Sequence, residues 1–499
     1  MPTLEVAPAW SAANAGDNGA PNAPNAPNTD TLTLWWERFD DPLLTRLVTR
    51  ALAANTTVVS AQAAVRQAQA LRDVASAALQ PTLGSSASAQ RATSGKNFGG
   101  SSGISGIDGI GGTSEASRST GNQFQLGLDG KWTPDVFGAQ RGGLNAAEAA
   151  ATASVASLGD AQVKVASEVA LNYILLRTSQ QRLVIASNNL SNQQELLQIT
   201  DWRQQAGLVT VLEVEQARAA AAQTQAALPL LKTSVGQTAH ALAVLVGQSP
   251  AALHAELGVM PSALESSSSL ESAPPLAGVP VSRSDIALSI PARVLRQRAD
   301  VRATELQVTA ALARVGQAEA QRWPSFSIGG TVGLSAISAA ALTNGASVLG
   351  SVLASVSWPV LDGGASKAQV RVQQAAFEQA QETYRAAVLA AMKEVENALT
   401  ALRGDGLRVA SLGVAANAAS NAALLARQRY SSGLIDFQIV LETQRNQFTT
   451  QDSVVSATLD VGSDQVRLFT ALGGGWPLDS SMASNAADAQ KAAQKAVAQ

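Results

Sequence analysis

Cysteine is absent from this chain of 499 residues, and histidine occurs only at positions 240 and 254. Without cysteine there is no disulfide framework, no thiol nucleophile and no thiolate metal site. His240 and His254 stand 14 residues apart without carboxylates at ligand spacing, which argues against a histidine-based metal centre. No catalytic motif is present, so we expect neither an enzyme nor a bound cofactor or metal.

Strong net charge, aromatic residues and long apolar runs are also scarce. The 35 basic and 38 acidic residues give a net charge of −3, so no nucleic-acid partner is expected. Aromatic residues make up 4% of the chain whereas apolar residues, mostly alanine, reach 46%, a combination that favours closely packed helices. No uninterrupted apolar run reaches 18 residues, which argues against a helical membrane span. The glycine-dense residues 106–112 precede no helix, so they do not predict a phosphate-binding loop.

One long uncharged stretch, residues 323–361, alternates between apolar and small residues. Large apolar side chains fall on even positions from Phe326 to Leu334, with serine and glycine between them. The pattern returns from Val352 to Trp358 after a turn of small residues. A period of two predicts a β-hairpin with one apolar face, flanked on both sides by helical sequence.

The same organisation occurs earlier in the chain, which identifies a tandem duplication. Residues 80–83 correspond to 323–326 at an offset of 243, and residues 132–138 correspond to 358–364 at an offset of 226. The offset falls because the first hairpin has the longer loop, rich in glycine and serine from about residue 95 to 121.

Each half also contains a very long helix. Residues 139–205 and 365–430 have no interior proline, and ~1.5 Å per residue gives each helix a length of roughly 100 Å. Apolar residues in the second helix step by three and four positions, which is typical of helices wound around one another. Gly207 and Gly433 are expected to end these helices and to reverse the chain.

These elements predict a mixed, mainly α protomer made of two repeats. Each long helix is matched in length by a return helix plus the helix that leads into the hairpin, so a break lies partway along each repeat. We expect the unmatched segments to form an equatorial belt around this break. The predicted parts are an extended N-terminal segment, residues 1–42; repeat 1, residues 43–247, with a hairpin at about 82–132, a long helix at 139–205 and a return helix at 208–246; a linker, residues 248–297; repeat 2, residues 298–475, with a hairpin at about 325–358, a long helix at 365–430 and a return helix at 434–472; and a partly disordered C-terminal tail, residues 476–499.

Four strands cannot close a barrel, and their apolar faces and unpaired edges need a partner. Strands of roughly 10 residues with apolar residues on one face and small or polar residues on the other fit a transmembrane β-barrel with an aqueous lumen. Three copies of four strands would supply about 12 strands, more than the smallest common barrel of ~8, and their helices would continue the barrel as a long α-helical tube. A soluble trimeric coiled-coil rod with a packed β-cap is the alternative.

Several segments resemble the TolC-like outer-membrane efflux channels, specifically the lipoprotein branch that serves resistance-nodulation-division pumps. Residues 290–305, IPARVLRQRADVRATE, are similar to the opening of that family's second repeat, although Ala299 stands where the family usually has proline. The other similar segments are residues 132–138, residues 359–364, Gly433 with Gln444 and Arg445, and residues 471–476, so that the similarity covers about residues 34–477.

This resemblance implies a homotrimer in the outer membrane of a Gram-negative bacterium. The trimer would contact the outer-membrane lipid, and its helical part would lie in the periplasm. The trimer would be a passive exit duct for small molecules, such as drugs, delivered by an inner-membrane pump of the resistance-nodulation-division type through a periplasmic adaptor. Type I protein secretion is a second use of such a duct, but residues 471–476, ALGGGW, resemble the small-molecule branch more.

The N-terminus departs from the family. That branch usually begins with a lipid-modified cysteine shortly before a proline-rich stretch that ends in tryptophan, and residues 2–10 resemble the end of this stretch. The cysteine is missing, so we expect that the leader and the lipid site were removed or replaced by Met1.

Rings of identical charges would control passage through such a channel, because each residue that faces the lumen of a trimer occurs three times. We expect the periplasmic gate at the two turns, residues 201–210 and 427–436. The candidates are Asp201, Arg429, Tyr430 and Asp436, with Asp436 as a constriction acid and Arg429 with Tyr430 tying neighbouring helices in the closed state. Ordinary solvated turn charges are the alternative.

Two further groups of residues follow from the resemblance and from position. The candidate adaptor contacts at the turns are Gly207, Leu208, Gly433 and Leu434. The strand ends carry four aromatic residues, Trp132, Phe137, Trp323 and Trp358. Aromatic girdles are expected where a barrel meets the membrane interface, and packing between barrel and helices is the alternative.

Overall fold

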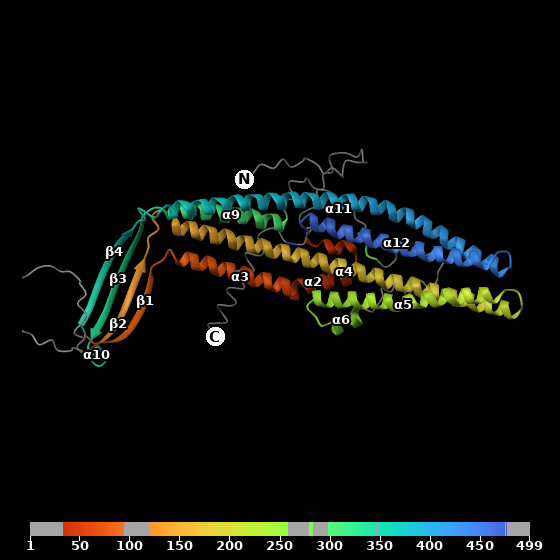
Figure 1. Ribbon diagram of the computed structural model, residues 1–499, viewed down its shortest axis with the longest axis horizontal. Helices are drawn as coiled ribbons and strands as arrows, with labels where there is room; N and C mark the ends of the chain where they lie inside the picture. The colour runs from red at the N-terminus through yellow and green to blue at the C-terminus, as the bar shows by residue number, and fades with distance from the viewer. Residues whose placement is uncertain are drawn as a thin grey trace, which may run out of the picture. The chain divides into compact units, whose positions relative to one another are not determined.

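The computed structural model describes residues 33–93, 120–257, 279–282, 298–344, 347–474 and 476 (Figure 1). The chain divides into two compact units. The sheet unit comprises the described residues of Ala68–Ala151 and Val308–Ala380, and the helical unit comprises the remaining described residues. The predicted fold class, mainly helical with a short sheet, is therefore correct.

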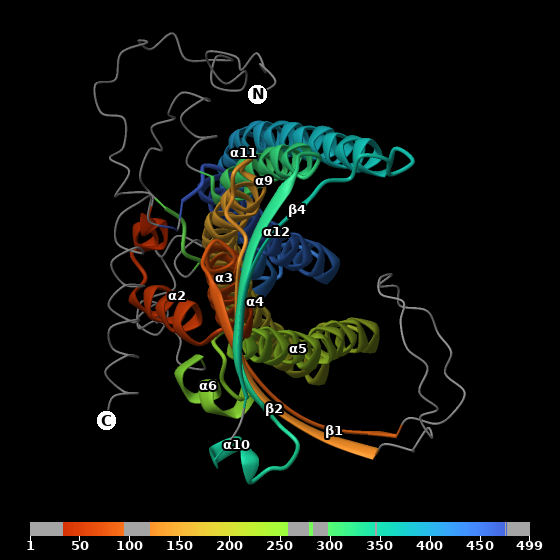
Figure 2. The ribbon, with the colours of Figure 1, turned by 90° about the vertical axis from the view of Figure 1, so that its left-hand side faces the viewer.

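The sheet unit contains one antiparallel sheet in which the strands lie side by side in chain order (Figure 1). The strands are β1 (Thr82–Thr93), β2 (Thr120–Trp132), β3 (Ser325–Ala336) and β4 (Ser347–Ser357), and a short helix, α10 (Ala341–Asn344), lies between β3 and β4. Both hairpins lie within the predicted ranges. Figure 2, turned by 90° from Figure 1, shows that the strands bend along their length.

The register gives the sheet one apolar and one polar face. Leu126 pairs with Leu334, and Leu334 pairs with Val348, so the large apolar side chains form rows across the strands. The opposite face carries mostly glycine, serine, threonine and glutamine, and the hydroxyls of Ser327 and Ser355 lie 2.7 Å apart on it. Alternation therefore separates the two kinds of side chain on β2 and β3, as the sequence predicts, whereas Leu349 and Leu353 of β4 pair with glycines on the polar face.

Two tryptophans fix the ends of the hairpins in equivalent ways. The indole Nε1 of Trp132 donates to the carbonyl oxygen of Leu79 at 3.1 Å, and that of Trp358 donates to the carbonyl oxygen of Arg322 at 3.2 Å. Each acceptor lies between a helix and the strand that follows it. The same contact therefore occurs once in each copy of the duplicated sequence.

Four helices continue from the sheet unit into the helical unit: α3 (Thr56–Ala77), α4 (Ala139–Gln205), α9 (Ala299–Ala320) and α11 (Ala365–Ser431). The predicted stripe along α11 is confirmed, because Val388, Ala391 and Val395 are all buried. By length and composition alone, α11 is also apolar enough to cross a membrane, and no other described helix meets that test.

The core of the helical unit surrounds the N-terminal elements, η2 (Trp35–Phe39) and α2 (Pro42–Ala54). Trp35 is fully buried and stacks on Phe469, with ring centroids 5.6 Å apart. Asp41 caps α2 by accepting from the amide of Leu43 at 2.9 Å. The sequence predicts an extended N-terminal segment, residues 1–42. Its described part instead contains the 3-10 helix η2, because three aromatic side chains of η2 pack into the core.

The return helices are α5 (Val211–Leu245) and α12 (Phe437–Ala471), and α6 (Pro250–Leu257) follows α5. Both return helices begin three residues later than predicted. Gly207 and Gly433 each have a φ of 73°, so the preceding helix ends there and the next N-cap lies at Thr210 or Asp436 in extended conformation. A left-handed glycine followed by an extended residue needs this extra length to reverse the chain.

Candidate functional site

The two turns between the long and the return helices have the same hydrogen bonds. The amide of Leu208 donates to the carbonyl oxygen of Arg203 at 2.8 Å, and the amide of Leu434 donates to that of Arg429 at 2.9 Å. Each glycine therefore closes its helix with a Schellman contact. The side chains of Leu208 and Leu434 are 69% and 73% exposed, so each turn presents an apolar residue to solvent.

Tyr430 joins the two turns. Its ring is buried, lies 4.5 Å from the guanidinium carbon of Arg203 and packs against Phe437 with centroids 5.5 Å apart. Arg203 Nη1 also donates to the carbonyl oxygen of Tyr430 at 2.6 Å, and the Tyr430 hydroxyl donates to Glu213 Oε2 at 3.4 Å. Burial raises the pKa of Tyr430, and the nearby Arg203 opposes this shift. Tyr430 thus connects the end of α11 with α4, α5 and α12.

The other predicted gate residues do not gather around Tyr430. Arg429 and Asp436 are exposed, and Asp436 occupies the N-cap of α12 without a side-chain cap hydrogen bond. Asp201 accepts from the side-chain amide of Gln205, one turn along α4, at 2.9 Å. Within one described protomer, these three side chains are turn residues in contact with solvent or with their own helix.

Sequence reasoning missed Arg203 and Glu213. The duplication could have indicated Arg203, because it stands 226 residues before Arg429 and is therefore its counterpart in the first half. Glu213 has no such signal, since the position 226 residues later is Ile439. The structure thus pairs Tyr430 with the counterpart of the arginine that was predicted to act beside it.

The four predicted interface aromatics lie at the ends of strands and helices in the sheet unit. Phe137 stacks on Trp323 with centroids 5.7 Å apart, whereas Trp132 and Trp358 make the backbone contacts described above. All four side chains remain between 40% and 57% exposed. They therefore combine a packed edge with a solvent-facing surface.

A second pair of equivalent contacts lies where the end of each return helix meets the start of the helix that leads into the hairpin of the same half. In the first half, Asn55 Nδ2 donates to the carbonyl oxygen of Leu245 at 2.8 Å. In the second half, Arg298 Nη1 donates to the carbonyl oxygen of Ala471 at 3.1 Å. Position 298 lies 243 residues after position 55, so the duplicated junction has a neutral side chain in one copy and a charged one in the other.

Arg298 also forms ion pairs with two carboxylates. Its Nη2 lies 2.7 Å from Asp300 Oδ2 and 2.7 Å from Glu394 Oε2, and the Arg298 side chain is 9% exposed. Burial alone would raise the pKa of Asp300, but the hydrogen bonds and charge of Arg298 outweigh burial and lower it. The two acids in turn raise the pKa of Arg298 against the effect of its own burial. Arg298 therefore joins the start of α9 to both α11 and the end of α12.

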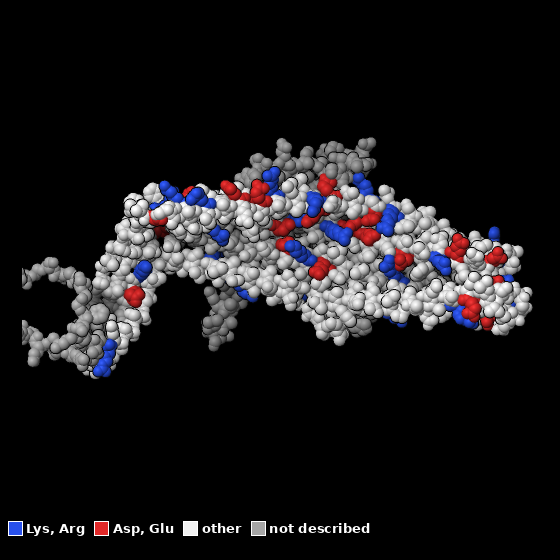
Figure 3. Space-filling view, viewed as in Figure 1, with Lys and Arg blue, Asp and Glu red and all other residues white. Residues whose placement is uncertain are grey.

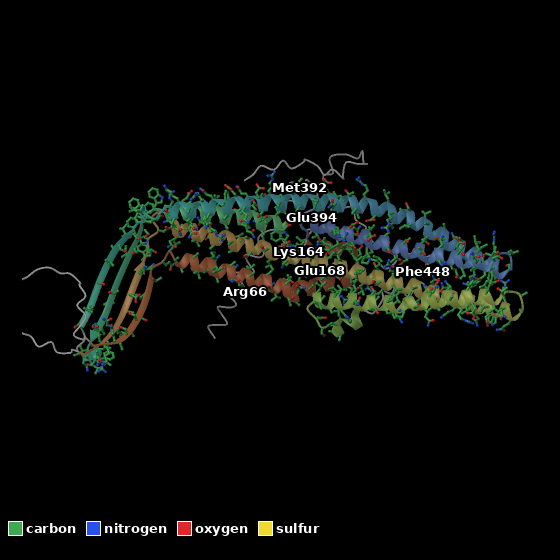
Figure 4. The ribbon with its side chains drawn as sticks, viewed as in Figure 1. Arg66, Lys164, Glu168, Met392, Glu394 and Phe448 are labelled. Carbon is green, nitrogen blue, oxygen red and sulfur yellow. The ribbon has the colours of Figure 1, made fainter. Side chains whose placement is uncertain are left out.

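A cavity of about 510 Å³ adjoins this junction. It is lined by α4, the start of α9, α11 and α12, and Figure 4 labels Lys164 on α4 and Glu394 on α11 at its border. Asp464 contributes a nearly buried carboxylate, whose Oδ1 pairs with Arg467 Nη1 at 2.9 Å. Burial and the neighbouring Asp405 carboxyl raise the pKa of Asp464, while Arg467 acts in the opposite direction.

Charged side chains of both signs alternate along the helices on the face shown in Figure 3, whereas the sheet shows few of them. Among the described residues, no group of three or more histidine, aspartate or glutamate side chains is placed to hold a metal ion.

The structure combines a two-faced sheet with long duplicated helices, a combination that defines a TolC-like outer-membrane channel protomer.

Comparison with known proteins gives the same class. The profile of the family described as "Outer membrane efflux protein" matches residues 47–248 and 290–474. The pyoverdine export outer membrane protein OpmQ of Pseudomonas putida is 30% identical, with 89% of each chain covered. Nodulation protein T of Rhizobium leguminosarum bv. viciae is 29% identical over 89% of this chain and 85% of its own. The solved outer-membrane channel OprN is 31% identical, with a TM-score of 0.77 over 89% of this chain and 93% of that one.

The chain belongs to the outer membrane efflux protein family, and it is an outer-membrane channel component of an efflux system in a Gram-negative bacterium. Members of this family are efflux channels rather than enzymes. The identification favours the predicted channel over the soluble coiled-coil rod.

Proposed function

We propose that three copies of this chain form a passive exit duct, with a 12-stranded β-barrel in the outer membrane continued by a periplasmic α-helical barrel. The observation that carries this proposal is the register of the sheet, which gathers the large apolar side chains of β2 and β3 on one lipid-compatible face and small or polar side chains on the other. Within the described sheet, β1 and β4 each pair on one side only. Joining β4 of one copy to β1 of the next would satisfy both edges.

In this assembly each chain contributes two repeats and the segments that flank them. We assign residues 43–247 and 298–475 to the two repeats, and the belt expected from residues 1–42, 248–297 and 476–499 lies largely outside the described residues. The contacts of Asn55 and Arg298 support a break between stacked helices in each repeat, because each joins the end of one helix to the start of another.

The partners follow from the family and from the turns. The duct would receive cargo from an inner-membrane pump of the resistance-nodulation-division type through a periplasmic adaptor. Gly207 and Gly433 shape the two turns, and the exposed side chains of Leu208 and Leu434 give the adaptor an apolar contact. The relative named for pyoverdine export supports a small-molecule cargo.

The same turns are the proposed gate. Asp201, Arg429, Tyr430 and Asp436 are the residues that we assign to it, and Arg203 joins them because it holds Tyr430. Four aromatic residues at the strand ends would lie at the periplasmic interface of the outer membrane, where half-exposed aromatic rings are favoured. They are Trp132, Phe137, Trp323 and Trp358.

Oligomeric state and conductance test the proposal together. The purified protein is expected to be a trimer that binds detergent, and to give discrete channel currents in planar lipid bilayers. Deletion of the gene should raise the sensitivity of the host to small toxic compounds, and the intact gene should restore resistance. A monodisperse monomer in detergent-free buffer would overturn the proposal.

A further inference from the structure

Two residues of opposite charge lie one above the other along β2 on the polar face of the sheet. Asp129 and Lys131 lie on β2, two residues apart, and alternation places them on the same face as Gln125. Among the described strand residues, this face otherwise carries small or uncharged side chains. The charged residue Arg91 of β1 falls on the apolar face, because its partner Asn122 has the same parity as Leu126.

The neighbours of Asp129 leave its carboxylate free to meet solvent. Its register partners are Gly84 on β1 and Thr331 on β3, and Thr331 pairs in turn with Ser351 on β4. A Cβ atom at Gly84 would lie 2.8 Å from Asp129 Oδ2, so the carboxylate extends over this glycine. The hydroxyls of Thr331 and Ser351 lie 2.8 Å apart and bond to each other.

Lys131 lies in the next row of the same face. Thr82 Oγ1 donates to the carbonyl oxygen of Lys131 at 3.1 Å, which fixes the backbone while the ammonium side chain remains exposed. Two strand residues span about 6.8 Å, so the acid and the base stand at different heights along the strand. No ion pair within 4.0 Å joins either side chain to another described residue. The two charges are therefore not neutralised by an ion pair within the described sheet.

We propose that Asp129 and Lys131 discriminate cargo by charge, as two stacked rings of opposite sign in the lumen of the barrel. This inference rests on the proposed trimer, which would place each residue three times around the same lumen. A cargo that carries both a cationic and an anionic group fits the double ring. A singly charged cargo meets one attractive and one repulsive ring.

Residues 1–499 contain no cysteine, so one introduced thiol is unique in this chain and permits a direct test. Thr331→Cys places this thiol in the row of Asp129 on the polar face. The trimer in lipid vesicles at ~10 mM salt is treated with methanethiosulfonates that carry a trimethylammonium or a sulfonate group, and modification rates are followed by mass. Low salt is needed because the Debye length is ~30 Å there but only ~3 Å at 1 M.

We expect the cationic reagent to react faster than the anionic one. Adding Asp129→Asn should reduce the ratio of the two rates roughly tenfold, because a unit charge at ~5 Å in water changes each rate roughly threefold to fourfold in opposite directions. Adding Lys131→Gln should raise the same ratio. Arg91→Gln is the matched control on the other face and should leave it unchanged.

A second thiol separates failure of this inference from failure of the channel proposal. Val332→Cys lies beside position 331 but on the apolar face, so lipid should protect it from both reagents. Equal reaction of the thiols at 331 and 332 would overturn the barrel. A reactive thiol at 331 and a protected one at 332, with a rate ratio that ignores Asp129→Asn and Lys131→Gln, would overturn the charge rings alone.

Discussion

The guanidinium carbon of Arg203 lies 4.5 Å from the ring centroid of Tyr430, and Arg203 Nη1 donates to the carbonyl oxygen of the same residue at 2.6 Å. One arginine of α4 thus binds both the side chain and the backbone of the last turn of α11. The contact joins the two long helices beside their turns, where the gate is proposed.

Loss of this contact is expected to favour the open channel. A cation–π contact contributes about 0.5–2 kcal/mol and a charged hydrogen bond about 1.5–3 kcal/mol, so Arg203→Ala should raise the open fraction by at least about tenfold. Single-channel recording in planar bilayers measures this fraction. Arg429→Ala removes the exposed counterpart and is expected to have a smaller effect; equal effects of the two variants would show that the buried contact is not what holds the turn.

Asp436 is expected to act through its charge. Asp436→Ala should raise closed-state conductance if three copies form a constriction ring, because a ring of like charges sets the local barrier to ions. Thr210→Ala is the matched control, since Thr210 occupies the same N-cap position before α5 and neither residue makes a side-chain cap hydrogen bond. The same conductance change in both variants would assign the effect to the helix end instead of the charge.

Arg298 is expected to contribute strongly to the stability of the second junction. Arg298→Ala leaves Asp300, Glu394 and the carbonyl oxygen of Ala471 without this partner. We expect a loss of about 2–3 kcal/mol, less than for a fully buried ion pair because Glu394 is half exposed. Thermal unfolding in detergent measures the loss. Asn55→Ala, which removes one neutral hydrogen bond, should cost about 1 kcal/mol, and a larger cost there would contradict this ranking.

Acidic pH is expected to weaken the same junction. The folded-state pKa of Asp300 is lowered, so its stabilising effect is present above the unfolded value of 3.8 and is lost as the pH falls through the lower folded value. The melting temperature of the wild type should therefore drop below about pH 4, and Asp300→Asn should flatten this part of the profile. An unchanged profile in the variant would exclude Asp300 as the titrating group.

Asp464 is expected to have the opposite pH dependence. Its folded-state pKa is raised, so its favourable contribution is present below 3.8 and is lost as the pH rises through the folded value. Asp464→Asn should therefore raise the melting temperature at pH 7. Asp460→Asn is the control, because its ion pair with Arg408 is about half exposed and such pairs contribute little. A melting temperature that falls in Asp464→Asn would contradict the prediction.

The sequence predicts the features that depend on local repetition. Alternation identifies both hairpins and their faces, and steps of three and four identify the buried stripe that contains Val388 and Val395. The same reasoning misplaces the starts of α5 and α12, because it does not include the extended residues after a left-handed glycine. It also misses the contact between Arg203 and Tyr430, which depends on how two helices distant in sequence pack together.

The duplicated junction has a further consequence for the proposed assembly. Each protomer has one junction secured by the neutral Asn55 and one secured by the ionic Arg298. Acid that protonates Asp300 weakens the ionic contact but leaves a neutral amide hydrogen bond nearly unchanged. A tube built from three such chains would therefore contain six junctions of two kinds. Acidification would weaken the three Arg298 junctions, while the three Asn55 junctions would keep their hydrogen bonds.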